Sequence, residues 1–162
     1  MQDGKKNSSE VTSPKWIICD LDGTLCDSKE RAHFIDKKEW DAFHSAGCFA
    51  EPIEQSIMVL RAMLQHKVVE RVCIITGRDE KYLQPTLDWL CDYGIHPDLI
   101  YMRKSKDYRP DIDMKGDFLK KLYKDASITK KDIFVVFEDR KKMVDWWRMM
   151  GFVCFQVAEG DY

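Results

Sequence analysis

Residues 16–24 read WIICDLDGT, a short apolar run that ends at two aspartates, a glycine and a threonine. The run itself covers residues 15–19, and four more of similar length follow, at 70–75, 98–102, 132–137 and 151–157. Short, continuous apolar runs are typical of strands that are buried on both faces of a parallel sheet. Between them, apolar residues recur at helical spacing over 53–65, 81–93, 111–123 and 140–150. This alternation predicts an α/β fold, a doubly wound parallel sheet of about five strands with helices on both faces.

The 162 residues suit one domain of ordinary size. Residues 1–13 are polar and offer almost nothing to bury, so we expect a flexible tail there and a single domain over 14–162. The segment at about 25–52 is longer than a usual connection between a strand and a helix. Long connections at strand ends commonly serve as lids or binding loops, so we expect a small insertion beside the site.

Charge and hydropathy exclude several classes of protein. The 26 basic and 28 acidic residues give a net charge of −2, which excludes a broadly basic nucleic-acid coat but not a local basic patch. No apolar run approaches the ~20 residues that span a bilayer, and the N-terminus is polar. We therefore expect no membrane segment, no signal peptide and a cytoplasmic location. The six cysteines form no C-x-x-C pair, which argues against a zinc knuckle and favours buried thiols in a reducing compartment.

Reactive polar residues follow three of the apolar runs. In an open parallel sheet, ligands bind beyond the carboxyl ends of the strands. The residues at these ends, with one lysine from the stretch 111–123, are Asp20, Asp22, Thr76, Gly77, Arg78, Lys115, Glu138 and Asp139. Taken singly, several have ordinary interpretations: a solvated lysine, an acidic helix cap, or a helix entry at Thr-Gly-Arg. Their joint order, each beside a strand or helix, favours a common site.

The residue types indicate the chemistry of that site. Clustered carboxylates repel one another, and burial raises their pKa values. Mg²⁺ removes the conflict, because it binds a few carboxylate or carbonyl oxygens and keeps several waters. A hydroxyl, a lysine and backbone N–H groups suit the oxygens of a transferring phosphoryl group. We interpret the site as a phosphoryl-transfer site with Asp20 as the candidate nucleophile.

Four motifs resemble those of the haloacid dehalogenase superfamily of phosphatases: DLDGT at 20–24, ITGR at 75–78, Lys115, and FEDR at 137–140. The resemblance implies a Rossmann-like fold with a small cap insertion, Mg²⁺, and an aspartyl-phosphate on Asp20. It makes Asp22 the general acid and later the general base. It gives the phosphoryl oxygens to Thr76 and Lys115. It places the metal on Asp20, the Asp22 carbonyl and Asp139, with Glu138 on the ion or beside it; which of Glu138 and Asp139 touches the ion is left open.

A closer resemblance is to the 3′-phosphatase domains of bacteriophage polynucleotide kinase-phosphatases. It continues from the last motif to the C-terminus, over EDRKKMVDWWRMMGFVCFQVAEGDY at 138–162. It implies substrate-binding roles for Arg31, Asp111 and the Gly77-Arg78 turn. Asp111 and Lys115 are four residues apart on a predicted helix and can pair, although surface charge is the ordinary explanation for each of these residues. No Gly-x-x-x-x-Gly-Lys-Ser/Thr sequence occurs, so we expect no kinase half within these residues.

The leading hypothesis is a Mg²⁺-dependent phosphomonoesterase that removes 3′-phosphates from DNA or RNA ends. One alternative is a phosphatase for free nucleotides or other small phosphomonoesters, and another is a non-catalytic interaction module on the same fold. Basic residues between the third apolar run and Lys115 suit a polyanion, although they suit a solvated loop equally well. They are Arg103, Lys104, Lys106 and Arg109. A separate kinase or ligase partner is compatible with this reading, and the oligomeric state is left open.

Overall fold

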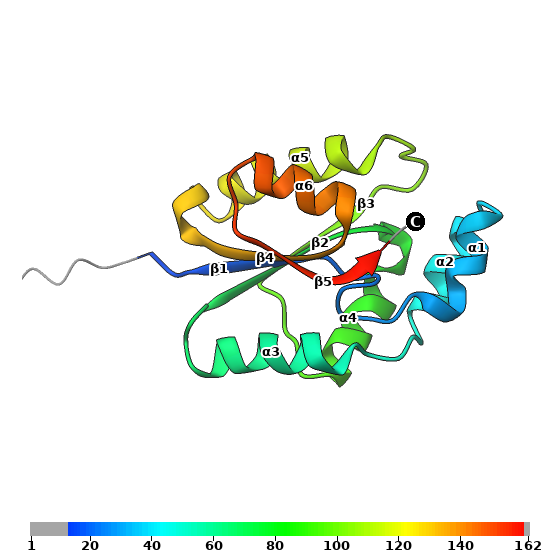
Figure 1. Cartoon of the computed structure of the whole chain (residues 1–162), viewed down its shortest axis with the longest axis horizontal. Coiled ribbons are helices and arrows are strands. Elements are labelled where there is room, and N and C mark those ends of the chain that lie inside the picture. The colour runs from blue at the N-terminus through cyan, green and yellow to red at the C-terminus, as the bar shows by residue number, and fades with distance from the viewer. Residues whose placement is uncertain (1–12, 161–162) are drawn as a thin grey trace, which may run out of the picture.

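The computed structural model describes residues 13–160, and Figure 1 shows their arrangement. The predicted flexible tail therefore lies, except for Ser13, outside the described residues. Five parallel strands form one sheet in the order β3-β2-β1-β4-β5. Their bounds are β1 Trp16–Cys19, β2 Arg71–Asp79, β3 Leu99–Arg103, β4 Ile133–Arg140 and β5 Cys154–Gly160. The predicted α/β parallel sheet is confirmed, with each strand at the apolar run that indicated it.

Four helices cover the two faces of this sheet (Figure 1). They are α3 Glu54–Gln65, α4 Leu83–Asp92, α5 Asp111–Asp125 and α6 Lys141–Met149. Successive strand residues point to opposite faces, so Ile17 joins the core beneath α3 and α4 while Ile18 joins the core beneath α5 and α6. Leu60 and Leu90 fill the first core, and Leu122 and Trp147 fill the second. Burial on both faces explains why the strands are continuously apolar.

The insertion at 25–52 is folded rather than irregular. It contains the 3₁₀ turn η1 Lys29–Arg31 and the short helices α1 Ala32–Asp36 and α2 Trp40–Gly47. Figure 1 places α1 and α2 at the end of the molecule to which the carboxyl ends of the strands point. We call this segment the cap. Asp41 of the cap accepts a hydrogen bond from the Tyr82 hydroxyl at 2.8 Å, in the 3₁₀ turn η2 Glu80–Tyr82, so the cap is tied to the sheet beside the predicted site.

Strands β2 and β4 run further than their apolar residues. Each includes the polar motif at its carboxyl end, with register irregularities between Thr76 and Asp79 and between Glu138 and Arg140. The reactive residues thus extend from a rigid sheet rather than from free loops. The cysteines of the apolar runs, Cys19, Cys73 and Cys154, are buried free thiols. None of the helices between residues 13 and 160 combines the length and apolar character needed to cross a bilayer.

Candidate active site

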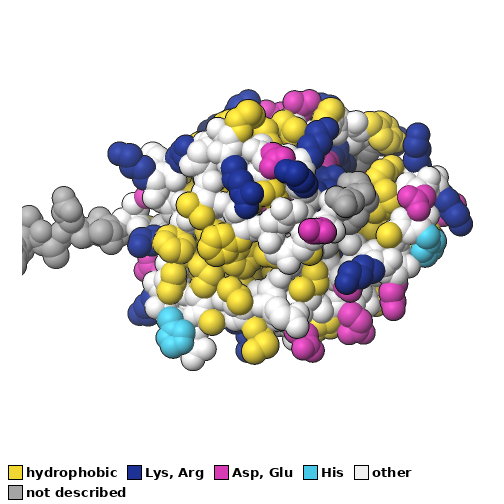
Figure 2. Space-filling view, viewed as in Figure 1, with side chains coloured by type: hydrophobic (Ala, Val, Ile, Leu, Met, Phe, Trp, Pro, Cys, Tyr) yellow, Lys and Arg dark blue, Asp and Glu magenta, His cyan; other side chains and the backbone are white. Residues whose placement is uncertain are grey.

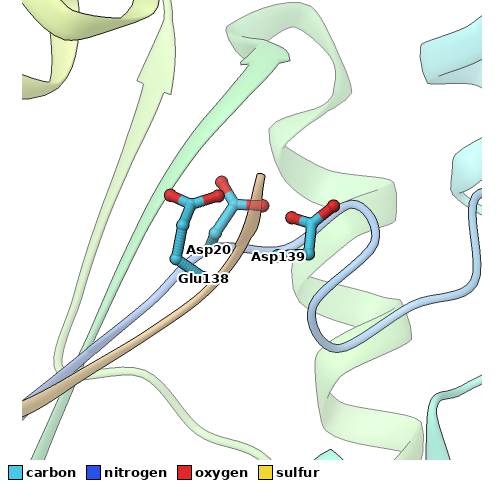
Figure 3. A group of neighbouring side chains, drawn as sticks. All are labelled: Asp20, Glu138 and Asp139. Atoms are coloured by element: carbon cyan, nitrogen blue, oxygen red, sulfur yellow. The ribbon is translucent and has the colours of Figure 1, made fainter. Parts of the chain in front are cut away.

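Three buried carboxylates meet where β1 and β4 end side by side. Asp20 follows β1 directly, and Glu138 and Asp139 are the sixth and seventh residues of β4. Figure 3 shows the three side chains projecting to the same side of the sheet end. Each offers an oxygen, and these atoms lie within 4.8 Å of one another. Parallel pairing of β1 with β4 brings these residues together from 118 positions apart along the chain, the difference between residues 20 and 138.

Lys115 inserts a positive charge among these carboxylates. It lies in α5 with its side chain 1% exposed. Its Nζ donates to Asp20 Oδ1 at 2.6 Å and to Glu138 Oε2 at 2.7 Å. Burial favours the neutral amine, but the two carboxylates outweigh it and raise the pKa of Lys115, so it remains an ammonium group. The predicted convergence of Lys115 with the first and last motifs is therefore present in the structure.

The carboxylate cluster still carries excess negative charge. Three carboxylates against one ammonium group leave a formal charge of −2 when all are ionised. Burial raises the pKa of Asp20 and that of Glu138, although Lys115 acts in the opposite direction on both. A divalent cation balances this charge, and an all-oxygen donor set suits Mg²⁺. The residues present therefore fit the predicted metal, with Asp20, Asp139 and Glu138 able to hold it.

Asp22 is held by two arginines that are far apart in the sequence. Its Oδ1 accepts from Arg31 at 2.7 Å and from Arg78 at 2.5 Å, and its Oδ2 accepts from Arg78 Nε at 3.3 Å. Burial raises the pKa of Asp22, but the two guanidinium groups outweigh it and hold the pKa far below the usual range. In this state Asp22 is a carboxylate, and both arginines are turned toward it.

Backbone groups of the cap and a buried hydroxyl fix these two arginines. Arg31 donates to the Phe43 carbonyl at 3.2 Å, and its guanidinium lies 4.2 Å from the centre of the Phe43 ring. Arg78 donates to the Gly47 carbonyl at 3.2 Å and to Thr86 at 3.1 Å. A Cβ on Gly47 would lie 2.7 Å from Arg78 and 2.8 Å from Arg31, so only glycine allows this approach. The cap is thus part of the site.

The threonines of two motifs, Thr76 in β2 and Thr24 in the turn after β1, orient neighbouring polar groups. Thr76 is 1% exposed, and its hydroxyl oxygen accepts the Arg78 backbone N–H at 3.1 Å, which shapes the turn through Gly77. Thr24 donates to Asp139 Oδ1 at 3.1 Å and so orients that carboxylate. A Cβ on Gly160 would collide with the Asp139 carboxylate, which requires glycine at the end of β5. Sequence reasoning assigned no role to Thr24 or Gly160.

The expected pairing of Asp111 with Lys115 is wrong. Asp111 accepts from Arg103 and from Arg140, which end β3 and β4. Lys115 is drawn instead into the deeper cluster, because two buried carboxylates attract it more strongly than one partly exposed neighbour on its own helix. A Cβ on Gly77 would lie 3.7 Å from Asp111, so this carboxylate and its two arginines form part of the rim beside the motif turn.

Sequence reasoning gave Arg103 only a possible steering role and Arg140 none. A positional signal was available for both, since each stands at the carboxyl end of a predicted strand. All eight motif residues do gather at this end of the sheet, together with Arg31 from the cap. Their individual chemical roles remain predictions.

Comparison with known proteins agrees with this geometry. A model of the family described as "Polynucleotide kinase PNKP phosphatase domain" matches residues 14–162. Two similar chains come from solved structures, one described as the Pnkp1/Rnl/Hen1 RNA repair complex and the other as the Pnkp1/Rnl/Hen1 complex. One is 33% identical with a TM-score of 0.73 and covers 92% of this chain and 44% of its own. The other is 31% identical with a TM-score of 0.74 and covers 97% of this chain and 52% of its own.

The chain thus spans about half the length of these relatives. A dehalogenase crystal structure, 12% identical with a TM-score of 0.57, covers 89% of this chain and 84% of its own and shares the fold. These matches confirm the resemblance to haloacid dehalogenase phosphatases that the four motifs indicated. The chain belongs to the family of polynucleotide kinase PNKP phosphatase domains.

Proposed function

We propose that this chain is a Mg²⁺-dependent phosphomonoesterase that removes phosphate from the 3′ ends of nucleic acids through an aspartyl-phosphate on Asp20. The observation that carries the proposal is the buried cluster of Asp20, Glu138 and Asp139 around Lys115, beside an Asp22 held by two arginines. The family supports a phosphatase acting on nucleic-acid ends.

In the proposed reaction, a residue of this site supplies the group that each step needs. The Asp20 carboxylate attacks phosphorus, and as the new bond forms, the bond from phosphorus to the sugar oxygen breaks. That oxygen leaves with the electron pair and takes a proton from Asp22. Water then attacks the aspartyl-phosphate and gives a proton to Asp22, which releases inorganic phosphate and restores Asp20. Lys115 and Thr76 bind the phosphoryl oxygens, and Mg²⁺ held by Asp20 and Asp139 would neutralise charge that develops on them.

The arginine pair has a place in the proton transfers. Without substrate, Arg31 and Arg78 keep Asp22 ionised. A substrate phosphate competes for the same guanidinium groups, because they are bidentate donors to either anion. Drawing them from Asp22 raises the pKa of Asp22, which prepares it to donate a proton. This proposal reconciles the predicted phosphate-binding role of both arginines with their observed contacts.

A polynucleotide end is favoured over a small phosphomonoester by the size of the cap and by the charge of the rim. The described cap helices have five and eight residues, which is little material to enclose a small substrate. Arg103 and Arg140 stand at the rim with one shared carboxylate, Asp111. Cations beyond the reacting group suit a substrate that continues as a polyanion.

Phosphate release from matched substrates tests this function. We expect Mg²⁺-dependent release from a 3′-phosphorylated oligonucleotide, little from its 5′-phosphorylated counterpart, and slower release from free 3′- and 5′-nucleotides. An Asp20→Asn preparation serves as the control for contaminating phosphatases. Equal efficiency on a mononucleotide and an oligonucleotide would replace end repair with a small-molecule phosphatase, and no release from any of them would favour an interaction module.

The partner and the location follow as further proposals. Similar chains occur in a complex with Rnl and Hen1, and this chain spans about half of each. We infer that any 5′-kinase or ligase step is supplied by a separate protein or a separate segment. A cytoplasmic location remains a prediction.

A further inference from the structure

Tyr108 is among the most exposed large side chains of the described residues, at 86%. It lies in the β3–α5 loop, residues 104–110, which joins β3 to α5 beside the site (Figure 1). The segment 103–109 reads RKSKDYR, with four cations and one acid, in a chain whose net charge is −2. An aromatic ring among cations is the combination that binds single-stranded nucleic acid, because bases stack on the ring while cations follow the backbone.

Hydrogen bonds hold this loop on the rim of the site. Arg103 donates to the carbonyls of Asp107 and Arg109 at 2.9 Å and 2.8 Å, and its other nitrogen binds Asp111. Ser105 donates to Asp79, at the end of β2, at 2.6 Å. The loop is therefore fixed to the ends of two strands that carry the site, and a ring mounted on it is positioned before substrate arrives.

Ion pairs hold the two residues that flank Tyr108. Asp107 accepts from the Arg109 backbone and guanidinium, so these two side chains lie on one side of the loop. Arg109 also binds Asp117 of α5 at 2.9 Å. The Tyr108 ring is exposed to solvent between Asp107 and Arg109, on the loop that joins β3 to α5 at the end of the molecule where the strands terminate.

We propose that Tyr108 is a stacking platform for a nucleobase next to the scissile 3′-phosphate. This inference rests on the proposed function and adds to it a contact with a base, which a phosphomonoester without a base, such as p-nitrophenyl phosphate, does not offer. Stacking is tolerant of sequence, because every base has a π-face. The contact is made equally in the ground state and the transition state, so it acts on KM rather than on kcat.

Substitutions at this one position separate ring stacking from apolar contact. For a 3′-phosphorylated oligonucleotide, we expect Tyr108→Ala and Tyr108→Leu to raise KM about five- to a hundredfold with kcat retained. Tyr108→Phe should stay within about twofold of wild type, because it keeps the ring. An oligonucleotide whose last two nucleotides are stable abasic analogues should show the same rise in KM with the wild-type protein. Its KM should not rise further with Tyr108→Ala.

Three results would overturn the inference. The first is a KM for Tyr108→Leu that matches the KM for Tyr108→Phe. The second is an abasic substrate whose KM rises with Tyr108→Ala as much as that of the normal oligonucleotide. The third is a parallel fall in p-nitrophenyl phosphate hydrolysis by Tyr108→Ala, which would indicate a structural role. Each leaves the proposed function standing as long as wild-type protein releases 3′-phosphate. If wild-type protein hydrolyses p-nitrophenyl phosphate but not the oligonucleotide, the proposed function fails first, and the stacking proposal fails with it.

Discussion

At the scale of single residues, the proposed reaction requires a buried carboxylate that lies beside Lys115 and can attack phosphorus. Asp20 is the carboxylate that meets both demands, since it accepts from Lys115 and directly follows β1. Asp20→Asn is nearly isosteric and can still accept from Lys115, but an amide oxygen is a poor nucleophile. We expect turnover to fall about a thousandfold or more with an unchanged circular dichroism spectrum. Activity within tenfold of wild type would contradict the assignment.

Glu138 and Asp139 are adjacent in sequence but differ in their partners. Glu138 accepts from the Lys115 ammonium group at 2.7 Å, whereas Thr24 donates its hydroxyl to Asp139 at 3.1 Å. Lys115 already supplies Glu138 with a positive charge, so a bound cation adds less at Glu138. We expect Asp139→Asn to weaken Mg²⁺ binding more than Glu138→Gln does, as measured by titration calorimetry. The opposite order would exchange their roles.

At the scale of elements, the cap helix α2 is fitted to the arginine pair. A methyl group on Gly47 would lie within 2.8 Å of both guanidinium groups. Gly47→Ala should therefore displace Arg31 and Arg78 from Asp22 and lower kcat by about tenfold or more, because misplacement by an ångström is costly. Gly116→Ala in α5 is the matched control, since its Cβ would meet Trp146 at an ordinary 3.6 Å. That control should keep its activity and gain about 0.5–1 kcal/mol of stability. Equal activity of the two variants would contradict the fitted role of α2.

His44 makes the same helix sensitive to acid. It is 8% exposed, and its ring faces Trp40, Phe43 and Tyr82. Burial lowers the pKa of His44 to about 4. Between about pH 6.5 and pH 4, the unfolded chain therefore binds a proton at His44 and the folded chain does not. Stability should fall as the pH drops from about 6.5 to about 4, by up to about 3 kcal/mol. The free energy of unfolding of His44→Gln, measured with urea, should lack this part of the decrease at low pH. Parallel loss in both proteins would assign it to other groups.

The elements that sequence predicts well are those whose pattern is long enough to repeat. The helices α3 to α6 each cover two or more turns with a buried stripe, and the strands are continuously apolar. The cap helix α1 has five residues and buries none of them, so it leaves no periodic signal. The Asp111–Lys115 pair fails for another reason: spacing on one helix is local, whereas the carboxylates that capture Lys115 arrive from β1 and β4 through tertiary folding.

At the scale of the whole molecule, charge is distributed rather than concentrated. Lys and Arg side chains alternate with Asp and Glu over the face seen in Figure 2, in line with a net charge of −2. A polyanionic strand is therefore attracted by local groups near the site and not by a general positive field. Exposed cations of this kind act over about a Debye length, roughly 8–10 Å at physiological salt.

Lys104 and Lys106 are exposed on the β3–α5 loop, at the end of the molecule that carries the site. Replacing both by Gln should raise KM for a 3′-phosphorylated oligonucleotide about three- to tenfold at 50 mM salt and leave kcat unchanged, because the two charges attract the strand without touching the reacting atoms. The effect should disappear at 0.5 M salt through screening. Lys67→Gln with Lys131→Gln removes the same charge from exposed positions that precede β2 and β4, at the opposite end of the sheet. This control should keep the wild-type KM at both salt concentrations. If the control pair raises KM as much as the loop pair does, attraction comes from total charge, and the strand has no preferred path across the rim.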